Sequence, residues 1–401
     1  MSNSPNTHPQ RSLTINAALV GIDFGKLDFE ASLQELDLLT QSAGATPVVT
    51  ITGRRHSPDA KLFIGSGKAE ELRLAIEEYD VELVIFNHAL TPGQQRNLEH
   101  LLQRRVVDRT SLILDIFAQR AKSHEGKLQV ELAQLRYLST RLVRAWTHLE
   151  RQKGGIGLRG PGETQLETDR RLLGDRVKSL EGRLQKLQRQ HDTQRRARQR
   201  SGTVSISLVG YTNAGKSTLF NAMTKANAYA ADQLFATLDT TSRRVYLGDV
   251  GNIVLSDTVG FIRELPHQLV AAFRATLEET VHADMLLHVV DASSQVRQEQ
   301  MAEVNAVLAE IDAADIPQII VWNKIDAVPE LAAQGPRIER DEAGRVARVF
   351  LSARTGQGLD LLREAISEAV VAGTAGLQSQ IEAPDVRLID RWGDVPRAED
   401  R

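Results

Sequence analysis

Cysteine is absent from this chain of 401 residues, which excludes disulfide bonds, thiolate zinc sites and thiol nucleophiles. The ten histidines show no HxxxH or HxH spacing, so a histidine metal site has no support. No apolar run reaches the length of about 18 residues that a membrane span needs, and we expect no membrane partner. The first dozen residues lack the apolar core of a signal peptide, which predicts a disordered leader over residues 1–12. Together these absences predict a cytoplasmic protein.

A strong excess of one charge is also missing. The net charge is −3, and 41% hydrophobic with 25% charged residues is close to an ordinary globular protein. The overall charge therefore gives no sign of a nucleic-acid partner. The length predicts two or three domains.

Residues 13–125 alternate short apolar runs with segments of helical spacing. Strands that alternate with helices of this length indicate an α/β domain with a mainly parallel sheet. The apolar runs, which we expect to form strands, are TINAALVGI (14–22), TPVVTITG (46–53), LFIG (62–65), VELVIFN (81–87) and RVVD (105–108).

Residues 126–200 show a different pattern, with two heptad-like apolar stripes on either side of a glycine-rich break. Such stripes predict two long helices folded into an antiparallel hairpin, with the glycines at its tip. Over residues 169–200, eleven Lys and Arg stand against four Asp and Glu, so the second helix is basic. The stripes consist of Leu128, Leu132, Leu135, Leu142, Trp146 and Leu149, then Leu166, Leu173, Val177, Leu180, Leu184 and Leu187; the glycines are 154, 155, 157, 160 and 162.

Strand–helix alternation returns over residues 203–371, which is a suitable length for one mononucleotide-binding domain. The remaining residues, 372–401, are polar, and we expect a weakly ordered tail.

The strongest motif in the chain is GYTNAGKST, which fits GxxxxGK[ST] between a predicted strand and a predicted helix. Its glycines let backbone N–H groups turn around phosphate oxygens, Lys216 supplies a charge to the β and γ phosphates, and Ser217 offers a hydroxyl to Mg²⁺. The predicted phosphate-binding residues are Gly210, Tyr211, Thr212, Asn213, Ala214, Gly215, Lys216, Ser217 and Thr218.

A second motif, DTVG, follows an apolar strand about 40 residues later. We expect Asp257 to hold the magnesium shell and the Gly260 N–H to meet the γ-phosphate, with Thr258 and Val259 in the same loop. Between the two motifs, we predict that Thr237 completes the magnesium coordination, although Thr240 and Thr241 are alternatives. The predicted metal set is therefore Ser217, Thr237 and Asp257.

Two further motifs select the base. In NKID, the Asp326 carboxylate can accept from both guanine N1–H and N2, a donor pair that adenine lacks, so the sequence predicts GTP rather than ATP. Asn323 can reach the N7 side of the purine, and the stem of Lys324 can lie over the base. The SAR segment, Ser352, Ala353 and Arg354, can bring backbone N–H groups to guanine O6.

Two residues bear on how GTP would be hydrolysed, with Lys216, Thr237, Gly260 and Asn213 as the predicted catalytic set. Phe261 occupies the position where a Ras-type enzyme has its water-orienting glutamine, so another group or a partner must orient the water. The amide of Asn213 can hold a K⁺ ion beside the phosphates, or it merely stabilises the loop turn. The sequence favours neither reading of Asn213.

The segment GGIGLRGPGETQLETDRR (154–171) is more specific than a linker. With FIGSGKAEEL (63–72), the segment 91–121 and FATLD (235–239), it closely resembles the HflX family of ribosome-associated GTPases, in the Obg–HflX group; the resemblance covers residues 14–371. It implies an N-terminal α/β domain, a helical hairpin and a Ras-like GTPase domain. It also implies binding to the large ribosomal subunit and splitting or rescue of stalled ribosomes under stress.

The chain departs from the family pattern in two places. Thr240 replaces the proline of FATLDPT, and many members carry a further C-terminal domain where this chain has its polar tail. A hydrophobic residue after DTVG, here Phe261, is typical of the family.

Other interpretations stay open. The basic hairpin suits RNA phosphates, but a charged helix can also simply face solvent. FIGSGKAEEL is more consistent with a structural turn than with a second nucleotide site, because it lacks the full phosphate-loop spacing. The alternatives to a ribosome-associated GTPase are a GTP-dependent RNA-binding scaffold with little turnover and an RNA-remodelling ATPase that uses the N-terminal domain. We expect a monomer, although the leucine stripes leave an oligomer open.

Overall fold

A computed structural model describes residues 15–25, 28–150, 161–200, 203–225, 234–263, 265 and 274–375. The predicted leader (1–12), four of the tip glycines (154, 155, 157 and 160) and the predicted tail after residue 375 lie outside these ranges. Among the described residues, no helix is long and apolar enough to cross a membrane.

The N-terminal domain is built around a parallel four-stranded sheet in the order β2-β1-β3-β4. The central strand β1 is buried along most of its length, because helices cover both faces of the sheet. The α/β class predicted for this part is confirmed. Its elements are β1 (Ile15–Asp23), α1 (Phe29–Ser42), β2 (Ala45–Arg54), α2 (Ser66–Glu78), β3 (Leu83–Phe86), α3 (Pro92–Leu102), β4 (Arg105–Asp108) and α4 (Arg109–Arg120).

The apolar run at 62–65 is not a strand, so that expectation is wrong. The Asp59 carboxylate accepts hydrogen bonds from the backbone N–H groups of Lys61 and Leu62, both at 2.8 Å, and bends the chain into a turn. Phe63 has a φ of 65°, and its backbone forms an isolated bridge with Asp59 instead of a strand. Phe63 and Ile64 are buried in the core of the domain, so the run is apolar because the turn is anchored there.

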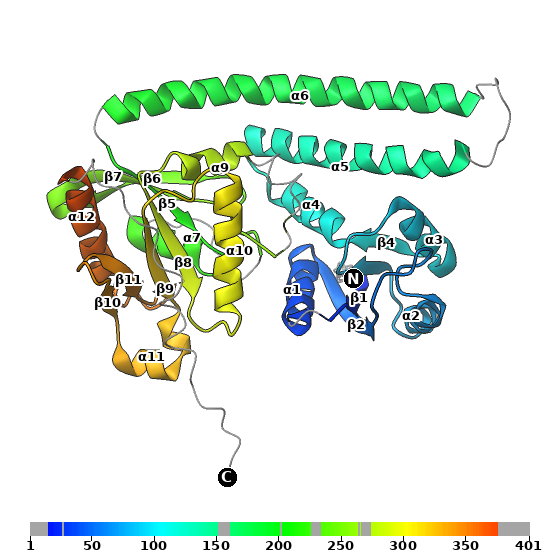
Figure 1. The fold of residues 1–401 in the computed structure, drawn as a ribbon, viewed down its shortest axis with the longest axis horizontal. Helices are drawn as coiled ribbons and strands as arrows, with labels where there is room; N and C mark the ends of the chain where they lie inside the picture. Colours follow the sequence, from blue (N-terminus) through cyan, green and yellow to red (C-terminus); the bar gives the residue numbers. More distant parts are fainter. Residues whose placement is uncertain are drawn as a thin grey trace, which may run out of the picture.

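The predicted helical hairpin is confirmed, with α5 (His124–Glu150) and α6 (Pro161–Arg200) lying side by side (Figure 1). Residues of the predicted stripes form its core, and ion pairs between Arg136 and Glu181 and between Arg176 and Glu131 flank them. The core residues are Leu128, Leu132 and Leu180, with Leu135, Val177, Leu184 and Leu187 packed against them.

Helix α5 is also fixed to the N-terminal domain. Asp108, at the end of β4, is 1% exposed and accepts from the Tyr137 hydroxyl at 2.8 Å and from the Arg141 guanidinium. Burial and the nearby Asp108 charge raise the pKa of Tyr137 well above its ordinary range, so this hydroxyl stays protonated and donates. A buried polar contact therefore joins the middle of α5 to the first domain.

The second α/β domain contains a seven-stranded sheet in the order β10-β11-β9-β8-β5-β7-β6. Its strands are parallel except for β6 and β10 at the two edges, each antiparallel to its neighbour, which confirms a mainly parallel sheet. The strands are β5 (Ser205–Val209), β6 (Thr241–Leu247), β7 (Gly251–Asp257), β8 (Met285–Asp291), β9 (Gln318–Asn323), β10 (Arg337–Arg340) and β11 (Val346–Phe350).

Helices cover both faces of this sheet. Helix α12 ends at Ala375, so residues 372–375 of the expected polar tail form its last turn. The helices are α7 (Lys216–Thr224), α9 (Arg274–Val281), α10 (Arg297–Glu310), α11 (Pro329–Gln334) and α12 (Leu359–Ala375), with short 3-10 turns η1 (Gly248–Val250) and η2 (Ile325–Ala327).

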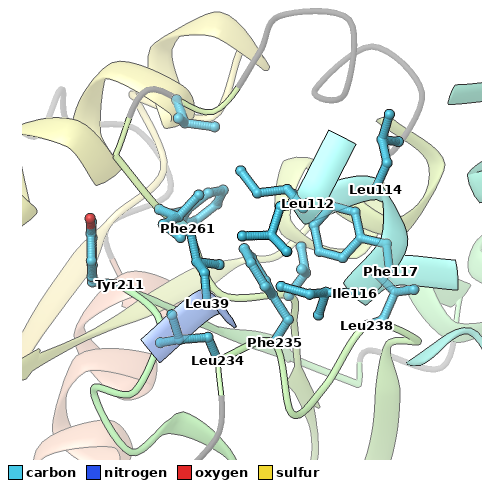
Figure 2. Packing of buried hydrophobic residues seen from close by; sticks show 14 of the residues in the cluster. Leu39, Leu112, Leu114, Ile116, Phe117, Tyr211, Leu234, Phe235, Leu238 and Phe261 are labelled. Atoms are coloured by element: carbon cyan, nitrogen blue, oxygen red, sulfur yellow. The ribbon is translucent and has the colours of Figure 1, made fainter. Parts of the chain in front are cut away.

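The two α/β domains share one hydrophobic cluster (Figure 2). Leu39 of α1 and Phe117 of α4 pack there against Phe235 and Phe261 of the second domain. The ring centroids of Phe117 and Phe235 are 4.6 Å apart, in an edge-to-face arrangement. The first domain therefore packs against the loops around residues 235 and 261 of the second domain.

Candidate active site

The phosphate-loop motif lies between β5 and α7, as its sequence predicts. Gly210 has a φ of 147°, and a Cβ there would lie 2.2 Å from the Val289 carbonyl oxygen of β8. Gly215 has a φ of 92°, and a Cβ there would lie 2.2 Å from the Asn323 side-chain nitrogen. Both positions therefore require glycine for two reasons, backbone conformation and close approach.

Lys216 is buried in the loop that it ends. Its Nζ donates to the carbonyl oxygens of Gly210 at 2.9 Å and Tyr211 at 2.7 Å. Burial lowers the pKa of Lys216 to about 8, and the charge of Asp257 opposes that shift. Phosphate oxygens placed beside Nζ would favour the charged form of Lys216.

The three predicted metal residues converge. Ser217 and Thr237 each donate to Asp257 Oδ2, at 2.7 and 2.8 Å, and their hydroxyl oxygens are 2.8 Å apart. They come from the start of α7, the loop before β6 and the end of β7. Burial raises the pKa of Asp257, while the Ser217 hydrogen bond and the Lys216 charge oppose the rise.

This oxygen set fits Mg²⁺. Within the described part of the chain, no group donates to the buried Oδ1 of Asp257, which leaves that oxygen for a cation or its water. No cluster of three or more His, Asp or Glu side chains that could hold a metal occurs among the described residues. One carboxylate and two hydroxyls are too few for an all-protein cage, but they suit an ion that keeps waters and binds substrate phosphates. Of the alternatives to Thr237, Thr241 lies in β6, opposite Asp257 in the strand ladder.

The DTVG loop is joined to the phosphate loop. The Thr212 N–H donates to the Phe261 carbonyl oxygen at 2.7 Å, and the Phe261 N–H donates to the Gly210 carbonyl oxygen at 3.2 Å. A Cβ on Gly260 would lie 3.0 Å from Lys216 Nζ, so this glycine sits directly beside the lysine. The Phe261 ring is 1% exposed and points into the shared cluster, where it has no role in orienting water (Figure 2).

In the predicted base-binding motifs, Asn323 joins two loops. It is 2% exposed, donates from Nδ2 to the Ala214 carbonyl oxygen and accepts at Oδ1 from the Ala353 N–H, both at 2.9 Å. Lys324 has a φ of 64° and its Nζ bonds Asp291 at 2.7 Å. Asp326 is exposed on η2, beside these loops. The remaining residues of the motif are the buried Ser352 and the exposed Arg354.

The sequence did not predict a charged network that joins the two domains at the phosphate loop. The Tyr211 hydroxyl donates to Glu35 of α1, and Glu35 is also ion-paired with Arg109 of α4. The Tyr211 oxygen accepts from the Arg263 N–H at 2.8 Å, and Arg263 is ion-paired with Asp28. Burial and Glu35 raise the pKa of Tyr211, so its hydroxyl stays a donor. These residues carry no local pattern that could have indicated the contact.

Comparison with known families agrees with the order of the motifs. The model described as "GTP-binding GTPase N-terminal" matches residues 30–118, "GTP-binding GTPase Middle Region" matches 120–198, and "50S ribosome-binding GTPase" matches 205–324. GTPase HflX of Escherichia coli (strain K12) is 55% identical over 376 residues, which cover 94% of this chain and 88% of that protein. The chain belongs to the HflX family. It is therefore a GTPase, and the predicted family and enzyme class are confirmed.

Other relatives and a solved structure agree. GTPase HflX of Magnetococcus marinus is 50% identical, covering 88% of this chain and 80% of that protein. The crystal structure of SsGBP in complex with GDP shares the fold, with a TM-score of 0.50 at 24% identity, covering 90% of this chain and 99% of that chain.

Proposed function

We propose that this member of the HflX family uses GTP and Mg²⁺ to act on the large ribosomal subunit, and that it splits or rescues stalled ribosomes under stress. The convergence of Ser217, Thr237 and Asp257 carries the chemical part of the proposal, because it joins the phosphate loop to the loop that precedes β6. A bound Mg²⁺ would supply charge stabilisation to the transferring phosphoryl group.

Each predicted site residue has a role in this proposal. The loop 210–218 cradles the phosphates, Lys216 and the Gly260 N–H meet the γ-phosphate, and Thr258 and Val259 complete the DTVG loop. Asp326 accepts from the guanine edge, with Asn323, Lys324 and the segment 352–354 around the base. A protein with the same fold, SsGBP, has been solved as a complex with GDP, which supports a guanine nucleotide as the ligand.

The ribosomal part of the proposal rests on the hairpin and on a family description. The description "50S ribosome-binding GTPase" belongs to the model that matches residues 205–324. Basic side chains are exposed along the second hairpin helix, where they can neutralise RNA phosphates. They are Arg170, Arg171, Lys178, Arg183, Lys186 and Arg189.

The buried position of Phe261 explains why a partner would be needed. Because this side chain cannot orient water, the site needs a further group for fast hydrolysis. A ribosome that supplies or positions such a group would couple hydrolysis to binding. A chain that binds GTP and hardly hydrolyses it without a partner is also compatible with this burial, which keeps the scaffold as the second candidate.

The test is the steady-state GTP hydrolysis rate in potassium buffer, with and without purified large ribosomal subunits. We expect a large stimulation. A rate that stays unchanged, in a protein with measurable GTP affinity, would favour the scaffold.

A pair of matched variants tests the hairpin. Lys186→Gln with Arg189→Gln should weaken the stimulation and reduce the salt dependence of ribosome binding, by about one unit of slope per lost phosphate contact. Arg340→Gln with Arg345→Gln, on the β10–β11 edge, removes the same charge far from the hairpin and should leave both unchanged. Equal effects of the two pairs would contradict an RNA contact on α6.

Three further expectations belong to the proposal. Asn213, exposed with a φ of 60°, would hold a K⁺ ion beside the phosphates; equal hydrolysis rates in potassium and sodium buffers would contradict this. A cytoplasmic location follows from a ribosomal partner and is tested by fractionation. A monomer is tested by light scattering of the purified protein.

A further inference from the structure

Asp239 of the FATLD loop lies at the start of the first hairpin helix. Its Oδ2 accepts from the backbone N–H groups of Lys122 and Ser123, both at 2.8 Å, and its Oδ1 accepts from the Ser123 hydroxyl at 2.6 Å. The Ser123 oxygen in turn accepts from the Gly126 N–H at 2.8 Å. A carboxylate from the GTPase domain therefore holds the two residues that directly precede α5, and Ser123 in turn supplies an acceptor to the first turn of the helix.

The fit between Asp239 and α5 depends on a glycine. A Cβ on Gly126 would lie 2.1 Å from Asp239 Oδ1, far inside contact distance. The close approach of the carboxylate gives a steric reason for a glycine in the first turn of α5. Gly126 leaves room for the carboxylate of the other domain.

The same loop carries Thr237, two residues before Asp239. Upstream, the Leu234 N–H donates to the Ser42 hydroxyl at the end of α1, at 3.0 Å. The ring of Phe235 packs on Phe117 of α4. The loop is thus held by the first domain on one side of Thr237 and by α5 on the other, while the Thr237 hydroxyl points to Ser217 and Asp257.

We propose that Asp239 is a positioning residue for GTP hydrolysis: because it is bonded to Lys122 and Ser123 at the start of α5, it fixes the Thr237 hydroxyl at the magnesium site. The proposal rests on the proposed role of Thr237 as a magnesium ligand. Thr237 and Asp239 are joined by two peptide units, which span at most about 7 Å, so moving one moves the other. A change at the base of the hairpin therefore reaches the magnesium site through Asp239, and a bound γ-phosphate reaches the hairpin by the same route.

The test uses the full chain and compares two nucleotides across a magnesium titration. A magnesium ligand from this loop acts in the triphosphate state, whereas GDP does not require it. We expect Asp239→Ala to lower the affinity for a non-hydrolysable GTP analogue about tenfold, the order of a lost helix cap, and to change GDP affinity less than about twofold. More magnesium should be needed for half-maximal hydrolysis. Asp239→Asn, which keeps an acceptor, should recover part of the loss.

Gly126→Ala should reproduce the effect of Asp239→Ala without a substitution in the GTPase domain, because the new methyl group displaces the Asp239 carboxylate. Thr91→Ala is the matched control. Thr91 caps α3 in a capping box with Gln94, in the N-terminal domain and away from the nucleotide loops, so its loss should lower stability and leave the magnesium dependence unchanged.

Thr237→Ala separates the two proposals. If it impairs analogue binding and Asp239→Ala does not, Asp239 has no positioning role, although the magnesium site stands. If Thr237→Ala itself leaves the magnesium dependence unchanged, the proposed ligand is wrong and this inference falls with it. If Asp239→Ala weakens GDP and analogue equally, or its effect adds fully to that of Thr237→Ala, its role is structural only.

Discussion

Replacing Glu35 with glutamine should destabilise the contact between the two α/β domains more than the loss of any exposed charge. The side chains of Glu35 and Arg109 are 11% and 5% exposed, and Glu35 also accepts from the Tyr211 hydroxyl of the phosphate loop. Breaking a buried pair by removing one charge costs about 3–5 kcal/mol, because the partner charge stays buried. Arg109 keeps two neutral acceptors, Asn87 Oδ1 at 3.0 Å and the Arg263 carbonyl oxygen at 3.3 Å. We therefore expect a loss near the lower limit, about 3 kcal/mol.

The assay is urea unfolding followed by circular dichroism, with a global fit that allows the two domains to unfold separately. Glu35→Gln should lower the free energy of unfolding, and Tyr211→Phe should lower it less, by about 1–3 kcal/mol for the groups left unpaired. Because Tyr211 and Glu35 touch, the double variant should lose less than the sum of the single losses. The control is Glu70→Gln on α2, an exposed partner of Arg73, for which we expect no measurable change. A loss below about 1 kcal/mol for Glu35→Gln would refute the buried pair as a bond between domains.

Three further predictions concern single side chains. Burial lowers the pKa of His288 to about 4, so the folded state disfavours its charged form. The free energy of unfolding should therefore fall as the pH drops below about 6.5, by about 2 kcal/mol at pH 5. Urea unfolding at pH 7 and pH 5 should show a smaller fall for His288→Gln than for the unsubstituted protein. Phosphates would raise the pKa of Lys216 from about 8, so GDP affinity should be constant below that pH and fall at most tenfold per pH unit above it. Calorimetry in buffers of different ionisation enthalpy should detect the proton uptake on binding. A GDP affinity that is independent of pH up to about 9 would contradict this coupling. Asp326→Asn should shift preference from GTP toward xanthosine triphosphate, because xanthine presents a carbonyl where guanine has an amine; competition binding that still favours GTP would remove Asp326 from the base pocket.

The fold class followed from the sequence because its signals are local. Apolar strands alternate with amphipathic helices, heptad stripes mark the hairpin, and the glycines of the phosphate loop stand where only glycine fits. The run at 62–65 was misread because a short buried turn and a short buried strand have the same apolar composition. The polar edge strand β10 carries no such local signal, because RIER has no apolar alternation.

Contacts between domains were beyond local reasoning. Phe261 was predicted to leave the site without its glutamine, but its burial against the first domain depends on residues more than a hundred positions away. Glu35 and Tyr211 are 176 positions apart, and no periodicity links an acidic residue on one helix to a tyrosine in a distant loop. The roles of the predicted site residues stay predictions until nucleotide binding is measured.

The lengths of α5 and α6 set how far the hairpin extends and which way its far end faces. At about 1.5 Å per residue, the 27 residues of α5 extend about 40 Å from Asp239, and α6 is followed in sequence by β5 and the phosphate loop. One residue added to α5 would turn the far end by about 100° around the helix axis, whereas a heptad added to both helices would keep its azimuth and lengthen the arm by about 10 Å. The span and phase of this arm could therefore be changed by insertion alone, with no substitution in the site that it serves.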